Sequence, residues 1–193
     1  MAANAAPGPG PAILVIGDSL SAEYGLQRDS GWVALLGRRL AQEKTGYQIH
    51  NSSISGDTTS GGLSRLPAAL ARYRPEIVIL ELGSNDALRG LSLKMTQDNL
   101  SKMVAMSQQS RASVLLLGMR IPPNYGRQYT EQFQQLFAAT AQEYKAALVP
   151  FLFEGIAADK RMFQADGMHP NEQAQATLAE NVWEKLQPML RPQ

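Results

Sequence analysis

Three short runs of almost uninterrupted apolar residues constrain the fold of this chain more than any other feature. They are AILVIG at 12–17, EIVILEL at 76–82 and SVLLLG at 113–118. A strand with one face in water alternates apolar and polar residues, whereas a strand covered on both faces reads as a continuous apolar run. We therefore expect these runs to be central strands of a sheet with helices on both faces. Two shorter runs, at 47–51 and 147–151, complete a set of five expected strands.

Helical patterns separate these runs, because large apolar residues recur three or four positions apart between them, as on one face of a helix. Ser30 and Asn171 are candidate N-caps of the first and last helices, and Pro67 suggests that the second helix begins near that residue. Five strand–helix units predict a three-layer α/β/α domain built on a parallel sheet with right-handed crossovers. We expect residues 12–193 to form this single domain, and the Pro/Gly-rich residues 1–11 to be a disordered lead-in.

Composition and charge exclude several classes of function. The 193 residues carry a formal net charge of +1, which gives no electrostatic footprint for nucleic acid or an anionic membrane. No run approaches the roughly 20 apolar residues of a membrane helix, so we expect no stable membrane insertion. Because the chain has no cysteine and only two histidines, we expect no disulfide and no metal site. Residues 1–11 lack the charged and apolar regions of a signal peptide, which leaves open a cytosolic start or a removed export signal.

Polar, glycine-containing segments follow the first three expected strands: GDSLS at 17–21, SISGDT at 53–58 and GSND at 83–86. In open α/β sheets, ligands bind beyond the carboxyl ends of the strands. A fourth segment, DGMHP at 166–170, precedes the last helix and is placed to return to the same edge. We therefore expect a site where these four segments meet.

Ser19 is the candidate nucleophile of this site. A serine hydroxyl needs a base to remove its proton, and the base needs a third group to orient it. His169 lies in a loop three residues after Asp166, and such a turn can bring the carboxylate to one imidazole nitrogen while the other faces Ser19. The alternatives are a helix cap at Ser19 and an incidental Asp–His pair at the entry to the last helix. His50 falls in an expected strand, and we interpret it as structural.

Acyl transfer also needs hydrogen-bond donors for the negative oxygen of its intermediate. Gly56 can offer an unshielded backbone N–H, Asn85 a side-chain N–H, and Ser19 its own backbone N–H. A turn glycine and an Asx turn are the alternatives for Gly56 and Asn85. The chain has no G-x-S-x-G elbow, no G-x-x-x-x-G-K-[ST] phosphate loop and no G-x-G-x-x-G after the first strand. Motif support for the usual α/β-hydrolase or a nucleotide-binding protein is therefore missing.

The four segments, in this order, resemble the sequence blocks of the GDSL, or SGNH, hydrolase superfamily. The resemblance is greatest to its multifunctional bacterial branch, the thioesterase I / protease I / lysophospholipase and arylesterase group. It extends through RLPAALARYRPEIVILELGSNDALRG and RIPPNYGRQY, and so covers roughly residues 12–188. It implies a five-stranded parallel sheet of flavodoxin-like order and a two-step acyl-enzyme mechanism without metal or cofactor. It also implies a periplasmic or secreted protein, with a cytoplasmic location as the alternative.

The resemblance carries residue roles to the matching positions of this chain. It implies a catalytic triad of Ser19, His169 and Asp166. It assigns the oxyanion hole to the Ser19 backbone N–H, Gly56 and Asn85. These are the roles that the chemistry of the four segments already indicated.

One position departs from the family pattern, because relatives commonly have a glycine where this chain has Glu23. If Glu23 faces the mouth of the site, its carboxylate would disfavour anionic substrates such as acyl-CoA; the alternative is a solvated surface charge. Residues 119–129 resemble a mobile loop that contacts the acyl chain, with Ile121, Pro122 and Tyr125 as candidate substrate contacts.

The sequence as a whole predicts a monomeric serine esterase acting on small-molecule aryl or short-to-medium acyl esters. Acyl thioesters and lysophospholipids are further candidate substrates. A carbohydrate O-deacetylase with the same triad is the alternative enzyme, and a non-catalytic flavodoxin-like binding module is the alternative from another class.

Overall fold

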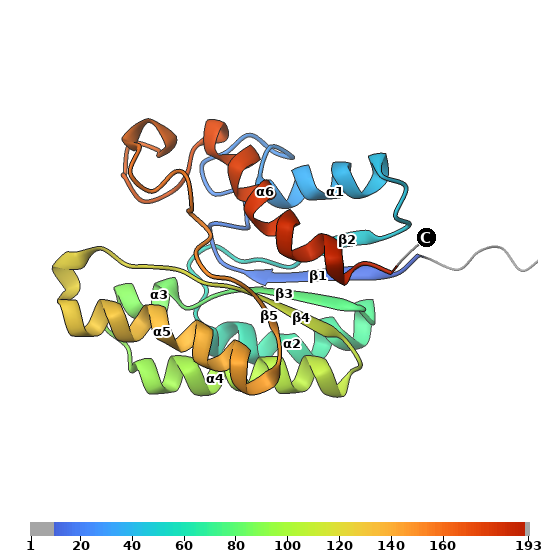
Figure 1. The fold of residues 1–193 in the computed structure, drawn as a ribbon, viewed down its shortest axis with the longest axis horizontal. Coiled ribbons are helices and arrows are strands. Elements are labelled where there is room, and N and C mark those ends of the chain that lie inside the picture. The colour runs from blue at the N-terminus through green and yellow to red at the C-terminus, as the bar shows by residue number, and fades with distance from the viewer. Residues whose placement is uncertain (1–9, 192–193) are drawn as a thin grey trace, which may run out of the picture.

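The computed structural model describes residues 10–191 and is built around one five-stranded parallel sheet (Figure 1). The strands pair in the order β2-β1-β3-β4-β5, which confirms the expected α/β class and its flavodoxin-like order. Their bounds are β1 Ala12–Gly17, β2 Gln48–Asn51, β3 Ile77–Glu81, β4 Ser113–Leu117 and β5 Ala147–Val149. Residues 1–9 of the expected lead-in lie outside the described residues. Pro11 belongs to the fold, because its carbonyl accepts a hydrogen bond from Gln48 N (2.9 Å).

Helices cover both faces of the sheet, as the apolar strand runs predicted. The helices α1 and α6 pack together on one face, whereas α2, α4 and α5 cover the other (Figure 1). Trp32 of α1 and Trp183 of α6 are buried, and so are Phe133 and Phe137 of α5 on the opposite face. The bounds are α1 Trp32–Gln42, α2 Thr59–Tyr73, α3 Ser84–Leu88, α4 Leu93–Gln109, α5 Arg127–Tyr144 and α6 Gln175–Leu186. Nowhere in the described residues is a helix long and apolar enough to cross a membrane.

Two of the expected helix starts are wrong. Ser30 does not cap α1, because its hydroxyl donates to Gln27 O (2.6 Å) within the preceding turn. The helix α2 begins well before Pro67, at Thr59, because Thr58 Oγ1 accepts from Gly61 N (3.3 Å) and starts the helix upstream. Pro67 therefore lies inside the helix.

The order of the strands creates a crevice at the carboxyl edge. The chain leaves β1 toward α1 on one face and leaves β3 toward α3 and α4 on the other (Figure 1). Because β1 and β3 are neighbours in the sheet, their loops diverge at this point, which is where doubly wound sheets bind ligands. Ser19 follows β1 and Asn85 follows β3, so both lie at the crevice.

Candidate active site

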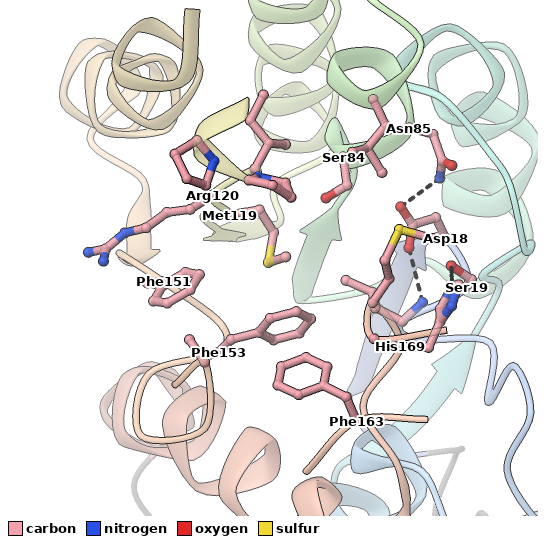
Figure 2. Close-up of a pocket in the computed structure, with 18 residues that line it drawn as sticks. Asp18, Ser19, Ser84, Asn85, Met119, Arg120, Phe151, Phe153, Phe163 and His169 are labelled. Atoms are coloured by element: carbon pink, nitrogen blue, oxygen red, sulfur yellow. Dashed lines mark hydrogen bonds between the residues drawn. The ribbon is translucent and has the colours of Figure 1, made fainter. Parts of the chain in front are cut away.

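Three side chains that are distant in sequence form a hydrogen-bonded chain at the crevice. Ser19 Oγ lies 2.9 Å from His169 Nε2 (Figure 2), and His169 Nδ1 lies 2.6 Å from Asp166 Oδ2. Burial opposes ionisation of Asp166, but the amides of His169 and Met168 and the His169 ring outweigh it and lower the pKa of Asp166 to about 2. The carboxylate is therefore an acceptor that fixes the histidine ring, in the arrangement that activates a serine.

The loop that carries His169 is held as a tight hairpin. Phe163 forms an antiparallel bridge with Pro170, and Gln164 N donates to His169 O (2.8 Å). Gly167, at the turn, has a φ of +68°, which side chains rarely adopt. Asp166 Oδ1 accepts the backbone N–H groups of Met168 (2.9 Å) and His169 (3.0 Å). The histidine is thus positioned by its own loop before it reaches Ser19.

Ser19 lies in a helical turn directly after β1, but its hydroxyl does not cap that turn. Asp18 takes the capping position, because its Oδ1 accepts from Leu20 N (3.0 Å) and its carbonyl accepts from Ala22 N (3.0 Å). The Ser19 side chain is left free to contact His169. The alternative that the sequence left open, in which Ser19 is a helix cap, is therefore wrong.

The three candidate oxyanion donors lie around the same turn. Asn85 Nδ2 donates to Asp18 Oδ2 (2.9 Å) and to Asp57 O (3.0 Å), which places Asn85 between the loops after β1 and β2. Gly56 precedes Asp57 and has a φ of +79°. Within residues 10–191, the backbone N–H groups of Ser19 and Gly56 have no protein acceptor, so both are available to a substrate oxygen.

Asp86 fixes the helix that presents Asn85. Its buried carboxylate accepts from Thr59 N (2.9 Å) and Thr59 Oγ1 (2.5 Å) at the start of α2. This contact ties α3 to α2, and therefore ties the Asn85 loop to the loop that carries Gly56. The relative position of the two donors is set by buried hydrogen bonds rather than by the exposed surface.

An apolar cavity of about 410 Å³ opens beside Ser19 and His169 (Figure 2), a volume in the range of small-molecule sites. Arg120 lies at the far end, and its guanidinium stacks on the Phe151 ring (4.3 Å) and points away from the cavity. Most of the wall is apolar, including Met119, Ile121, Pro122, Phe151, Phe153 and Phe163. An acyl chain or an aromatic ring fits this apolar lining. In the part of the chain that the structure describes, no three or more His, Cys, Asp or Glu side chains are grouped so that they could hold a metal ion.

Two of the four candidate substrate contacts are placed as expected. Ile121 and Pro122 line the cavity. Tyr125 does not, because it lies in a short 3₁₀ turn and its hydroxyl donates to Leu88 O (3.3 Å) on the outside. Glu23 does not line the cavity either. It has a φ of +60°, and its carboxylate accepts the N–H groups of Asp29 (2.9 Å) and Gly31 (2.8 Å) ahead of α1. The expectation that Glu23 faces the mouth of the site is therefore wrong.

Several residues at the site were missed by the sequence reasoning. Tyr24 packs its ring against His169, with 4.5 Å between centroids. Phe151 and Phe153 follow β5, which ends at Val149. The strand was expected to run to residue 151, so the rule that sites lie beyond strand ends did not identify them. Glu81 is fully buried and accepts from the residues on either side of the Ser19 turn, Asp18 N and Ser21 Oγ. Its signal in the sequence was an acidic residue inside an apolar strand run.

Comparisons with known proteins show which family this chain is similar to. Residues 15–177 match the model of the GDSL-like lipase/acylhydrolase family. Esterase TesA of Pseudomonas aeruginosa is 51% identical over 178 residues, which are 92% of this chain and 89% of that protein. An arylesterase of Vibrio mimicus is 40% identical, over 90% of this chain and 87% of that one. The thioesterase 1/protease 1/lysophospholipase L1 of Escherichia coli K12 is 40% identical, over 92% and 84%.

A solved structure shows the same likeness in three dimensions. The psychrotrophic esterase EstA from Pseudoalteromonas sp., inhibited by monoethylphosphonate, superposes with a TM-score of 0.88. The two chains are 40% identical, over 93% of this chain and 98% of that one.

Proposed function

The chain belongs to the GDSL-like lipase/acylhydrolase family and is a serine esterase, and we propose that Ser19, His169 and Asp166 carry out its reaction. Ser19 Oγ attacks the ester carbonyl carbon while its proton passes to His169 Nε2. The ionised Asp166 accepts from His169 Nδ1–H, which keeps Nε2 free as the base and stabilises the imidazolium that forms. The contact of 2.9 Å between Ser19 Oγ and His169 Nε2 is the observation that carries this proposal.

The negative oxygen of the tetrahedral intermediate is received by the N–H groups of Ser19 and Gly56 and by one N–H of Asn85 Nδ2. In the free site both Asn85 N–H groups are engaged, by Asp18 Oδ2 and Asp57 O, so the N–H held by the neutral carbonyl of Asp57 turns to the oxyanion. When the intermediate collapses, the C–O bond to the leaving alcohol breaks and His169 returns its proton to that oxygen. Water then attacks the acyl-enzyme, with His169 again taking a proton, and the acid leaves as Ser19 recovers its hydrogen. No cofactor is required to balance these steps.

The apolar cavity supports aryl or short-to-medium acyl esters as substrates. An acetyl group needs only room for one methyl, so an apolar cavity of about 410 Å³ favours longer acyl groups over the O-acetyl sugars of a deacetylase. Because Glu23 is turned toward α1, it gives no reason to exclude anionic substrates. The names of the relatives then support thioesters and lysophospholipids as further candidates.

A substrate panel tests the proposal. Wild type, Ser19→Ala and the control Ser64→Ala, an exposed serine on α2, are assayed on aryl acetate, longer aryl esters, acyl-CoA and lysophospholipid. We expect Ser19→Ala to lose nearly all turnover and its labelling by an ethylphosphonate, while Ser64→Ala behaves as wild type. Turnover that survives Ser19→Ala contradicts the mechanism, and release of acetate alone would indicate a deacetylase.

A periplasmic or secreted location and a monomeric state are proposed on the family resemblance. Cell fractionation of the native organism tests the first, and the molar mass in solution tests the second. Cytoplasmic activity or a stable dimer would contradict them.

A further inference from the structure

A buried carboxyl group that the proposed reaction does not use lies directly beneath the nucleophile turn. Glu81 ends β3 and is fully buried. Its Oε2 accepts from Asp18 N (3.3 Å) and Ser21 Oγ (2.7 Å), whereas its buried Oε1 has no protein partner. Gly17, at the end of β1, is the residue that pairs with Glu81 in the sheet. A Cβ on Gly17 would lie 2.9 Å from Glu81 Oε2. The absence of a side chain at position 17 therefore makes room for this carboxyl group.

Glu81 shares its surroundings with a second buried carboxyl group, that of Asp18. Within residues 10–191 neither group forms an ion pair with a lysine or arginine. Arg65 passes nearby, but it pairs with Asp57 (2.8 Å) and donates to Gly17 O (3.2 Å). Two buried carboxylates without a cation are unfavourable, and a proton on one of them relieves both burial and repulsion.

The hydrogen bonds show which of the two keeps the proton. Burial raises the pKa of Glu81 well above its usual value, and the charge of Asp18 raises it further. Burial also raises the pKa of Asp18, but the donors Leu20 N–H and Asn85 Nδ2 favour its charged form and hold the value to about 6. The oxygen without a partner belongs to Glu81, so Glu81 is protonated and Asp18 is ionised at neutral pH.

An ionised Asp18 determines which end of the Asn85 amide faces the nucleophile turn. Asn85 Nδ2 lies between two acceptors, Asp18 Oδ2 and Asp57 O. If the amide were reversed, its oxygen would face both of these oxygens, one of them charged. The carboxylate thus keeps the donor end of Asn85 at the site.

We propose that the buried pair Asp18 and Glu81 carries a single negative charge, held on Asp18 while Glu81 is neutral, and that Asp18 is the positioning residue for the oxyanion donor Asn85. This rests on the proposed function only in that Asn85 acts as such a donor. If Glu81 were also ionised, its negative charge would repel the oxyanion that develops during the reaction. A neutral Glu81 avoids this repulsion.

Infrared spectroscopy tests the protonation directly on the wild-type protein. At neutral pH we expect the C=O band of a protonated carboxyl group, lost in Glu81→Gln and kept in the control Glu76→Gln. Glu76 lies just before the same strand and forms an ion pair with Arg191. A wild-type spectrum without the band, or a band that survives Glu81→Gln, overturns the pair.

A double-mutant cycle tests the positioning role. In Asp18→Asn one side-chain oxygen is replaced by a donor, so Leu20 N–H and Asn85 Nδ2 cannot both be accepted. We expect kcat to fall about tenfold or more, with KM unchanged, and Asp18→Asn/Asn85→Ala to be no slower than Asn85→Ala. Multiplicative losses overturn the role, and thermal unfolding checks that the variants are folded. Failure of the proposed function would be recognised separately, by full turnover in Ser19→Ala.

Discussion

The position of Glu23 can be tested, because its carboxylate either faces the mouth of the cavity, as the sequence suggested, or holds the turn before α1, as the structure shows. The carboxylate accepts two backbone N–H groups ahead of α1, those of Asp29 and Gly31. Each such hydrogen bond contributes about 1 kcal/mol net. Glu23 also holds a φ of +60°, which costs a residue with a Cβ about 1 kcal/mol relative to glycine.

These terms predict different stabilities for two variants. Glu23→Ala loses both hydrogen bonds and keeps the unfavourable φ, so its free energy of unfolding should fall by about 2 kcal/mol. Glu23→Gly loses the same bonds but relieves the backbone, so it should fall by about 1 kcal/mol. Denaturant titration followed by circular dichroism measures both values, and Tm should drop by about 2–4 °C per kcal/mol.

The activity of the same variants separates the two accounts. Because Glu23 does not line the cavity, kcat/KM for acyl-CoA relative to a neutral aryl ester should match wild type in both variants. A carboxylate at the mouth predicts the reverse: unchanged stability and a selective gain on acyl-CoA in Glu23→Gly. That result would refute the assignment of Glu23 to the turn before α1.

Three further predictions concern the site. Asn85→Ala should lower kcat about 10²–10³-fold, the usual loss for one oxyanion donor, measured on an aryl ester with unfolding as control. The pKa of Asp18 rises from 3.8 to about 6 on folding, so its stabilising contribution is complete below pH 3.8 and is lost as the pH rises through 6. Over this window wild type should lose about 3 kcal/mol relative to Asp18→Asn in denaturant titrations, and a constant difference would contradict the shift. Phe153→Trp should narrow the cavity and lower kcat/KM for medium-chain aryl esters about tenfold relative to aryl acetate, and equal losses would show that Phe153 does not contact the chain.

The sequence was most informative where a topological rule placed reactive residues, because sites in open α/β sheets lie beyond the carboxyl ends of the strands. Parallel strands bring their carboxyl ends to one edge of the sheet. Ser19 and Asn85 each follow such a strand, so the sequence alone predicted that they lie near each other. His169 followed because it was the one histidine outside an expected strand, with Asp166 within reach. Ile121 and Pro122 were named by the family resemblance, and the structure places both in the wall of the cavity, after β4 at the same edge.

The sequence was least informative where a backbone angle or an element boundary decided the outcome. The direction of Glu23 depends on a positive φ, which no local pattern marks for glutamate. Phe151 was assigned to a strand that ends at Val149, so the aromatic wall of the cavity was not recognised. The proline rule failed at Pro67 because a cap at Thr58 had already started the helix.

The active site joins two segments that lie far apart in the sequence, and this affects when it forms during synthesis. The Ser19–His169 contact spans 150 positions, and α1 is tied to the last helix by the bond from Trp32 N to Gln175 Oε1 (3.0 Å). At about 5–20 residues per second, a ribosome adds those positions in about 8–30 s. Throughout that time a nascent chain already carries its serine but has no base to activate it. The enzyme therefore gains its activity only after His169 and the loop that carries it have been made.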